Sequence, residues 1–282
     1  MTINIELLNE LATVSSTQVC GQITVRGFSI PIENWLRFRL SNSSARAIRV
    51  APDVTCCVAF GNDHPYLSQA LSSIAAQNML PAKILVGIDN SSGLSEETQN
   101  DLVDIHHFRG RNGPFFIMDS LIRMADSKYI LIMDSDDISH PDRLELLLNC
   151  AVEGEAEVVG SAVGNFEEYD EKISTLGVFP RDPYEALANG LCHAMLYPTI
   201  LIRRSAYLDI GGFSDFDFFG MDTDFIVRLA HRRRGVNLPL PLYAKRRRTM
   251  SLTECRSTGM ESDRRANILE YTSTRHRALF SG

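Results

Sequence analysis

The residues best suited to chemistry form an acidic run near the middle of the chain. Asp134, Asp136 and Asp137 lie within four positions, directly after the apolar residues 129–133. Carboxylates this close repel one another at neutral pH, so the fold is expected to neutralise them with a bound partner. Positions i and i+2 allow Asp134 and Asp136 to face one hard cation, leaving room for water and diphosphate oxygens. The run therefore predicts a Mn²⁺ or Mg²⁺ site at these two residues.

A second acidic pair lies in the last third of the chain. Asp222 and Asp224 follow Gly211, Gly212 and Gly220 and precede the amphipathic residues 225–231. The pattern predicts a loop that leads into a helix. A carboxylate there can act as a general base on an acceptor hydroxyl if it lies within hydrogen-bonding distance of it. The alternative is that Asp222 only caps the helix.

Length and composition indicate a globular protein. The chain has 282 residues, of which 44% are hydrophobic and 22% charged. No apolar run approaches the roughly 20 residues of a spanning helix, and no basic stretch followed by an apolar one begins the chain. The six cysteines lack the paired spacing of a metal site, which favours a reducing compartment. We therefore expect a cytoplasmic protein.

The net charge of -7 is unevenly distributed. Residues 228–282 hold 13 Lys and Arg but only 4 Asp and Glu. A basic surface of this kind attracts a diphosphate, an acidic acceptor or anionic lipid, so peripheral contact with an inner membrane face is one expectation. The alternative is a solvated helix face. Nucleic acid is disfavoured because the tail lacks the interleaved aromatic residues of base-stacking surfaces.

The elements that would position these residues alternate between strand and helix. Apolar strands are expected at 54–60, 83–88 and 129–133, and helices are expected to begin near Pro65, Ser95, Phe115 and Pro141. This order predicts an α/β fold with a Rossmann-like, mostly parallel central sheet flanked by helices. Ligands of such sheets bind beyond the carboxyl ends of the strands, where Asp89 and the acidic run are both expected.

Composition changes suggest three segments. Residues 1–51 are interpreted as an N-terminal extension of unknown role, with a helix over 3–12, a strand over 22–32 and Trp35 as a packing anchor. Residues 52–252 form the main domain, and residues 253–282 form a basic helical tail.

Taken in order, these motifs resemble family 2 of the inverting glycosyltransferases, which have the GT-A fold. The resemblance covers about residues 52–252 and is strongest in the run DSDDISHPDRLE at 134–145. It implies sugar transfer, with inversion, from a nucleotide-diphosphate donor, with a UDP-sugar favoured. The implied acceptor is a hydroxyl of a glycan, a lipid-linked sugar or a small molecule.

The resemblance also implies roles for individual residues. In the family an Asp after a Gly-Gly-Phe turn is the catalytic base, which here is Asp222. The implied nucleotide-binding residues are Phe60, Asn62, Asp89, Asp134 and Arg248, and the implied metal ligands are Asp134 and Asp136.

Four positions depart from the family pattern. Gly61 replaces an aromatic residue of the first turn, Met118 stands where the family often has Arg, and Met221 replaces the Glu before the base. Arg248 stands where a histidine is common, and a guanidinium cannot ligate a cation, so we expect it to contact the diphosphate. These departures keep open a catalytically weak nucleotide-sugar-binding pseudoenzyme. A nucleotidyltransferase is the other alternative, although the glycine-rich phosphate loop of that class is missing.

Overall fold

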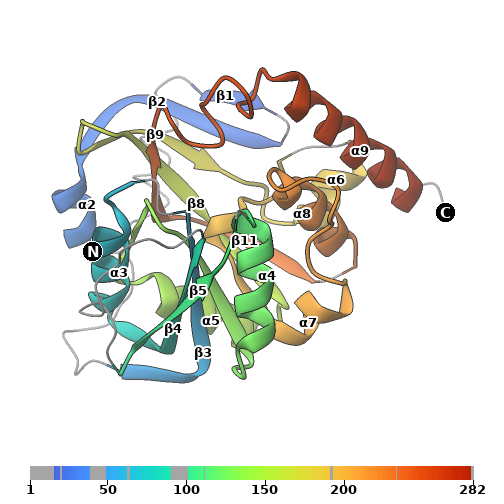
Figure 1. Cartoon of the computed structure of the whole chain (residues 1–282). Coiled ribbons are helices and arrows are strands. Elements are labelled where there is room, and N and C mark those ends of the chain that lie inside the picture. Colours follow the sequence, from blue (N-terminus) through green and yellow to red (C-terminus); the bar gives the residue numbers. More distant parts are fainter. Residues whose placement is uncertain are drawn as a thin grey trace.

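The computed structural model describes most of the chain. It covers residues 16–19, 21–38, 49–61, 64–89, 101–110, 112–190, 193–232 and 234–280. These residues fold around one twisted sheet with helices on both of its faces (Figure 1). Within these ranges no helix is both long enough and apolar enough to cross a bilayer.

Strands and helices alternate along much of the chain. The strands are β1 (Ser16–Val19), β2 (Gln22–Pro31), β3 (Arg49–Phe60), β4 (Met79–Asp89), β5 (Val103–Phe108), β6 (Tyr129–Asp134), β7 (Ile138–Ser139), β8 (Val158–Glu167), β9 (Lys172–Val178), β10 (Leu201–Arg203) and β11 (Gly235–Arg247). The helices are α2 (Ile32–Arg37), α3 (Leu67–Ala75), α4 (Pro114–Met124), α5 (Arg143–Glu153), α6 (Pro183–Ala188), α7 (Arg204–Asp209), α8 (Met221–Arg232) and α9 (Asp263–Phe280), with a short 3₁₀ helix, η2, at Tyr197–Thr199.

Parallel strands make up the half of the sheet that carries the acidic run. Their order is β6-β3-β4-β5, so their carboxyl ends lie at one edge. β3 is a continuous apolar run over residues 56–58 because helices cover both of its faces. The predicted strands are confirmed, but β4 begins at Met79, since residues 79–81 extend the pairing with β3.

The other half of the sheet is mainly antiparallel. From β6 the order continues through β10, β8, β9, β2 and β1, each antiparallel to the next. β11 runs parallel to β8 and also pairs with the short β7. The predicted α/β class with a central sheet flanked by helices is confirmed, and the sheet is mixed rather than uniformly parallel.

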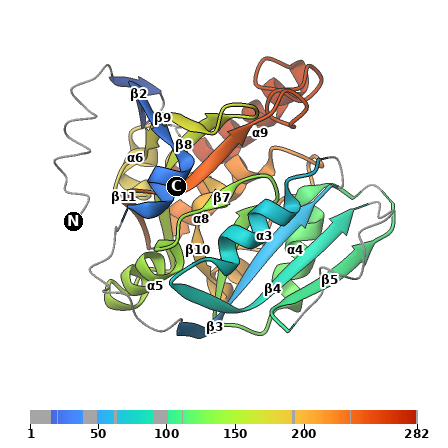
Figure 2. The same ribbon diagram turned by 90° about the vertical axis from the view of Figure 1, so that its left-hand side faces the viewer.

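Helices pack on both faces of the parallel strands. Figure 2 shows β3, β4 and β5 side by side, with α3 and α4 on opposite faces. α5 shares the face of α3, and α8 shares that of α4. Gly87 lets α4 approach β4 closely, because an added Cβ would lie 2.3 Å from Cγ2 of Ile117. The helices therefore enclose the parallel strands on both faces.

The segment before β3 joins the same sheet. β2 pairs with β9, which confirms the strand predicted at 22–32. Trp35 of α2 is 1% exposed and its Nε1 donates to the carbonyl of Pro241 at 2.9 Å, so it is the packing anchor expected. The helix predicted over residues 3–12 and the one expected after Ser95 lie outside the described residues.

Candidate active site

The predicted site residues meet at one cavity beyond the carboxyl ends of β3, β4 and β6. The cavity has a volume of about 490 Å³. Of the residues predicted from sequence, its walls include Phe60, Asp89, Asp134, Asp136, Asp222 and Arg248. The departures Gly61 and Met118 also line it. Asn62 lies outside the described residues, so its role stays a prediction.

The acidic run turns from the end of β6 into β7. Asp134 and Asp136 are half-buried, whereas Asp137 is 1% exposed. Burial and the negative charge of Asp136 raise the pKa of Asp134 to about 7, although the positive charge of Lys245 opposes this rise. Burial likewise raises the pKa of Asp137 well above its usual value, although its Oδ1 accepts a hydrogen bond from the backbone N–H of Arg246 at 2.7 Å. The turn therefore crowds three acidic groups together, and in this environment the protonated forms of Asp134 and Asp137 are favoured.

Strand β11 brings basic residues to this turn. β7 pairs with Tyr243 and Ala244 of β11, so the residues after them lie beside the aspartates. The backbone N–H of Asp134 donates to the Tyr243 hydroxyl at 3.1 Å. Nε of Arg246 donates to the carbonyl of Asp136 at 2.9 Å, and its guanidinium lies 3.9 Å from the Tyr66 ring centroid. Arg246 thus supports the turn, and it lines the cavity together with Lys245 and Arg248.

Arg248 contacts a predicted metal ligand directly. Its Nε lies 2.6 Å from Oδ2 of Asp136, and the two side chains are only 8% and 16% exposed. A charged hydrogen bond this short and enclosed is stronger than a surface ion pair. In this structure the guanidinium therefore neutralises Asp136. Contact between Arg248 and a diphosphate stays a prediction.

The carboxylates fit a hard divalent cation. Asp134 and Asp136 both line the cavity, and within the described ranges no group of three or more His, Cys, Asp and Glu converges on one point. Two carboxylates completed by water and substrate phosphate are a usual environment for Mg²⁺. A metal ion bound here would have to share the carboxylate of Asp136 with Arg248, or displace the guanidinium of Arg248 from it.

Asp89 ends β4 at the cavity and is 7% exposed. Its carboxylate accepts hydrogen bonds from the backbone N–H groups of Asn112 at 3.0 Å and Gly113 at 2.9 Å, and from the Asn112 side chain at 3.1 Å. Asp89 therefore holds the turn before α4. Its predicted contact with the donor stays a prediction.

An aromatic group lies where the first turn meets the cavity. Phe60 is 3% exposed, and its ring centroid lies 5.0 Å from that of His64. Nδ1 of His64 accepts from the backbone N–H of Tyr66 at 3.1 Å, and Nε2 lies 3.1 Å from Oγ of Ser135. Since Gly61 carries no side chain, His64 supplies a ring to this wall.

Asp222 lies in the first turn of α8. The predicted loop does lead into a helix, and the helix begins at Met221, so both acidic residues lie in its first turn. Negative charge is favourable at this end of a helix. Asp222 is half-buried, lines the cavity and is close enough to Asp134 to raise the pKa of that carboxyl. Asp224 is 0% exposed and paired with two arginines, which leaves Asp222 as the carboxylate of this pair that lines the cavity.

Sequence reasoning missed several residues of the cavity wall. Lys245 and Arg265 supply positive charge, and Tyr197 and His64 supply rings. Lys245 was visible as part of a basic run, but only the pairing of β11 with β7 shows that it lies near the aspartates. No local signal marked Arg265, which reaches the cavity from α9.

Comparisons with known proteins agree with this geometry. Residues 55–211, more than half of the chain, match the family described as Glycosyl transferase family 2. A curated relative, glycosyltransferase GlyG of Streptococcus pneumoniae serotype 4 (strain ATCC BAA-334 / TIGR4), is 29% identical over 124 residues. That match covers 42% of this chain and 40% of GlyG, so the chain spans well under two thirds of its relative.

Solved structures of S. aureus TarS share the fold. TarS 1–349 in complex with UDP-GlcNAc has a TM-score of 0.58 and 17% identity, covering 80% of this chain and 73% of TarS. TarS 1–349 alone has a TM-score of 0.60 and 15% identity, covering 81% and 69%. At such identities the likeness concerns the fold, which is of the GT-A type. Together, the family match and the cavity at the strand ends show that the chain belongs to glycosyl transferase family 2.

Proposed function

We propose that this glycosyltransferase moves a sugar from a UDP-sugar to an acceptor hydroxyl with inversion, assisted by a divalent cation. The observation that supports this most is the gathering of Asp134, Asp136, Asp222 and Arg248 around one cavity. Such a transfer needs carboxylates that hold a metal ion, a carboxylate that acts as a base, and a positively charged side chain that binds phosphate.

The donor would lie with its diphosphate near the acidic turn. Asp89 and Phe60 line the part of the cavity at the ends of β3 and β4, which suits the nucleoside. The TarS structures with UDP-GlcNAc and with UDP support a uridine nucleotide. Lys245 and Arg248 would then contact the phosphate oxygens. Arg248 offers a planar guanidinium, and Lys245 offers an ammonium group on a flexible stem.

Asp134 and Asp136 would hold Mn²⁺ or Mg²⁺. When bound, the cation supplies charge that stabilises the departing diphosphate. Arg248, which pairs with Asp136, would share this task. Retention of both aspartates in the cavity wall disfavours the alternative of a pseudoenzyme.

The transfer would be a single displacement. Asp222 accepts the proton of the acceptor hydroxyl as its oxygen bonds to the anomeric carbon, and the bond from that carbon to the diphosphate breaks with its electron pair leaving on phosphate. One displacement inverts the configuration at the anomeric carbon. Lys245 and Arg248 compensate the charge that develops on the leaving group.

The acceptor is proposed to be a hydroxyl of a glycan, a lipid-linked sugar or a small molecule. The cytoplasmic location, with peripheral contact at an inner membrane face, is likewise part of this proposal. Part of the positive charge of the tail already has partners within the protein: Arg264 pairs with Asp217 at 2.7 Å and Arg275 with Asp224 at 3.3 Å. The exposed Arg256 of the tail would face the anionic surface.

A donor screen tests the proposal. Thermal unfolding would be measured with UDP-GlcNAc, UDP-glucose, a GDP-sugar and a CDP-sugar, each with Mn²⁺ and with a chelator, because a ligand that binds only the folded state raises its stability. The donor that stabilises is then incubated with the enzyme, and the products are identified. We expect a UDP-sugar to stabilise only with the cation, and to yield UDP and free or transferred sugar. Stabilisation without turnover would support the pseudoenzyme, and release of pyrophosphate would support a nucleotidyltransferase.

A further inference from the structure

A buried carboxylate lies one turn from the proposed base. Asp224 of α8 is 0% exposed. Its Oδ2 lies 2.9 Å from Nε of Arg228 and accepts a hydrogen bond from the hydroxyl of Ser214. Its Oδ1 lies 3.3 Å from Nε of Arg275, close enough for an ion pair but not aligned as a hydrogen bond. A buried charge of this kind persists only with such partners.

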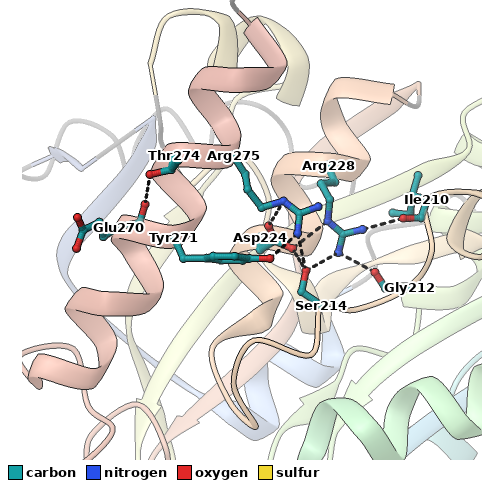
Figure 3. Close-up of polar contacts among 9 residues, drawn as sticks. All are labelled: Ile210, Gly212, Ser214, Asp224, Arg228, Glu270, Tyr271, Thr274 and Arg275. Atoms are coloured by element: carbon teal, nitrogen blue, oxygen red, sulfur yellow. Dashed lines mark hydrogen bonds and ion pairs between the residues drawn. The ribbon is translucent and has the colours of Figure 1, made fainter.

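Arg228 ties the helix to the preceding turn. Its Nη1 donates to the carbonyl of Ile210 at 2.8 Å, and its Nη2 donates to that of Gly212 at 2.7 Å. Arg228 lies one helical turn after Asp224, so the guanidinium joins the helix, the buried carboxylate and the Gly-Gly-Phe turn (Figure 3). These contacts explain how the segment before α8 is held in place.

Arg275 extends the network to the tail helix α9. Its Nη1 donates to Oγ of Ser214 at 3.1 Å and to the hydroxyl of Tyr271 at 2.7 Å. Figure 3 shows the side chain of Arg275 reaching from α9 toward Asp224, beside Arg228. Its own side chain is 38% exposed, whereas that of Asp224 is fully enclosed. The buried carboxylate of α8 thus depends on a cation from a separate element.

The tail helix also packs against the start of α8. Ile268 of α9 joins Phe219 and Met221 in a small core cluster, and Leu279 packs beside Val227 of α8. Gly220, immediately before the helix, has a φ of +71°, and a Cβ there would lie 2.7 Å from Nη1 of Arg265. The backbone leading into Asp222 therefore lies directly against α9.

We propose that Arg275 is a positioning residue for sugar transfer. Its ion pair with Asp224 fixes the first turn of α8 and with it the carboxylate of Asp222, which is two residues earlier. The inference rests on the proposed role of Asp222 as the base. Because Arg275 does not line the cavity, its effect is on the position of the base and not on donor contact. Small displacements of a reacting group are costly: about 1 Å lowers a rate by roughly 10²-fold.

The test compares Arg275→Ala, Arg275→Lys and Arg277→Ala. Arg277 is the matched control, because it carries the same charge two residues further along α9 and its side chain is exposed. Each variant is assayed for UDP release from UDP-GlcNAc, or from the nucleotide sugar that wild type turns over fastest, and for UDP affinity by calorimetry. For Arg275→Ala we expect kcat to fall by roughly 10- to 100-fold, with donor KM and UDP affinity within about twofold of wild type. Arg275→Lys should restore part of kcat, and Arg277→Ala should match wild type.

Repeating the Arg275→Ala substitution in a protein that already carries Asp222→Asn separates this inference from the proposed function. In Asp222→Asn, adding Arg275→Ala should change kcat little, because a base that is absent cannot be misplaced. If Asp222→Asn alone keeps near-normal turnover, the proposed function fails, whatever Arg275→Ala does. If Asp222→Asn is impaired but Arg275→Ala keeps normal kcat, the positioning role is overturned. It is also overturned if Arg275→Ala lowers UDP affinity and kcat together, or if Arg277→Ala loses as much activity.

Discussion

The contact between Arg248 and Asp136 predicts opposite effects of one substitution on two ligands. In the wild type, Mn²⁺ competes for Asp136 with the guanidinium of Arg248, whose Nε lies 2.6 Å from Oδ2 of Asp136. Arg248→Ala removes this competitor. A hydrogen bond between charged groups contributes about 1.5–3 kcal/mol, and these side chains are too enclosed for strong screening by salt. At about 1.4 kcal/mol per tenfold change, Mn²⁺ should bind the nucleotide-free variant roughly 10- to 100-fold more tightly. UDP affinity should fall by a similar factor, because a phosphate contact is lost.

Mn²⁺ binding is measured by electron paramagnetic resonance of the free ion, and UDP and uridine binding by calorimetry at fixed Mn²⁺. Arg247→Ala is the matched control, because Arg247 is the preceding residue but lies on the surface, 3.6 Å from Glu167 and 3.3 Å from Glu254. Uridine affinity should not change in either variant. Unchanged Mn²⁺ affinity in Arg248→Ala would refute the competition, and equal losses of UDP affinity in both variants would show that the basic run acts only through its summed charge.

Three further predictions follow from the contacts around the acidic turn. Asp136→Asn should remove the gain in UDP affinity that Mn²⁺ gives the wild type, as seen by calorimetry with and without chelator; an undiminished gain would place the cation elsewhere. Arg143→Met should lower the free energy of unfolding in urea by about 3 kcal/mol, because the buried guanidinium donates to the carbonyls of Ile132 and Pro198 at 2.7 and 2.8 Å; a loss no larger than in exposed Arg37→Met would contradict this. Burial lowers the pKa of His140 from its usual 6.5 to about 4, so the unfolded chain takes up the proton at a higher pH than the folded chain does. The free energy of unfolding should therefore fall as the pH drops from 6.5 toward 4, by about 3 kcal/mol at the lower end. The pH profile of unfolding should flatten over that range in His140→Gln, and an unchanged slope would count against the assignment.

The parts of the fold that sequence predicted well depend on local patterns. The strand ending at Asp134 was evident because a continuous apolar run is typical of a strand covered on both faces, and an acidic run directly after it lies at the edge of a parallel sheet. The role of Asp222 came from the resemblance and not from spacing alone. Its place in the cavity wall is consistent with that role.

The remaining features depend on long-range pairing that no local pattern encodes. The contact of Arg248 with Asp136 requires β11 to lie beside β7, two elements that are about 100 residues apart in sequence. The sequence pattern predicted a loop that leads into a helix, but it did not predict that Asp224 is buried, because that burial depends on tertiary partners. For the same reason the tail appeared to be a charged surface, although Arg275 pairs with α8.

The most direct test of the account is the effect of Asp222→Asn on donor binding and turnover, measured on the same preparation with Mn²⁺ and a saturating UDP-sugar. Asparagine keeps the size of the side chain but cannot accept the acceptor proton. The account predicts a UDP-sugar affinity within about twofold of wild type and a turnover lower by roughly 10² to 10⁴, the range typical of the loss of a general base. Turnover within a few-fold of wild type, with donor still bound, would contradict the role of Asp222 as the base.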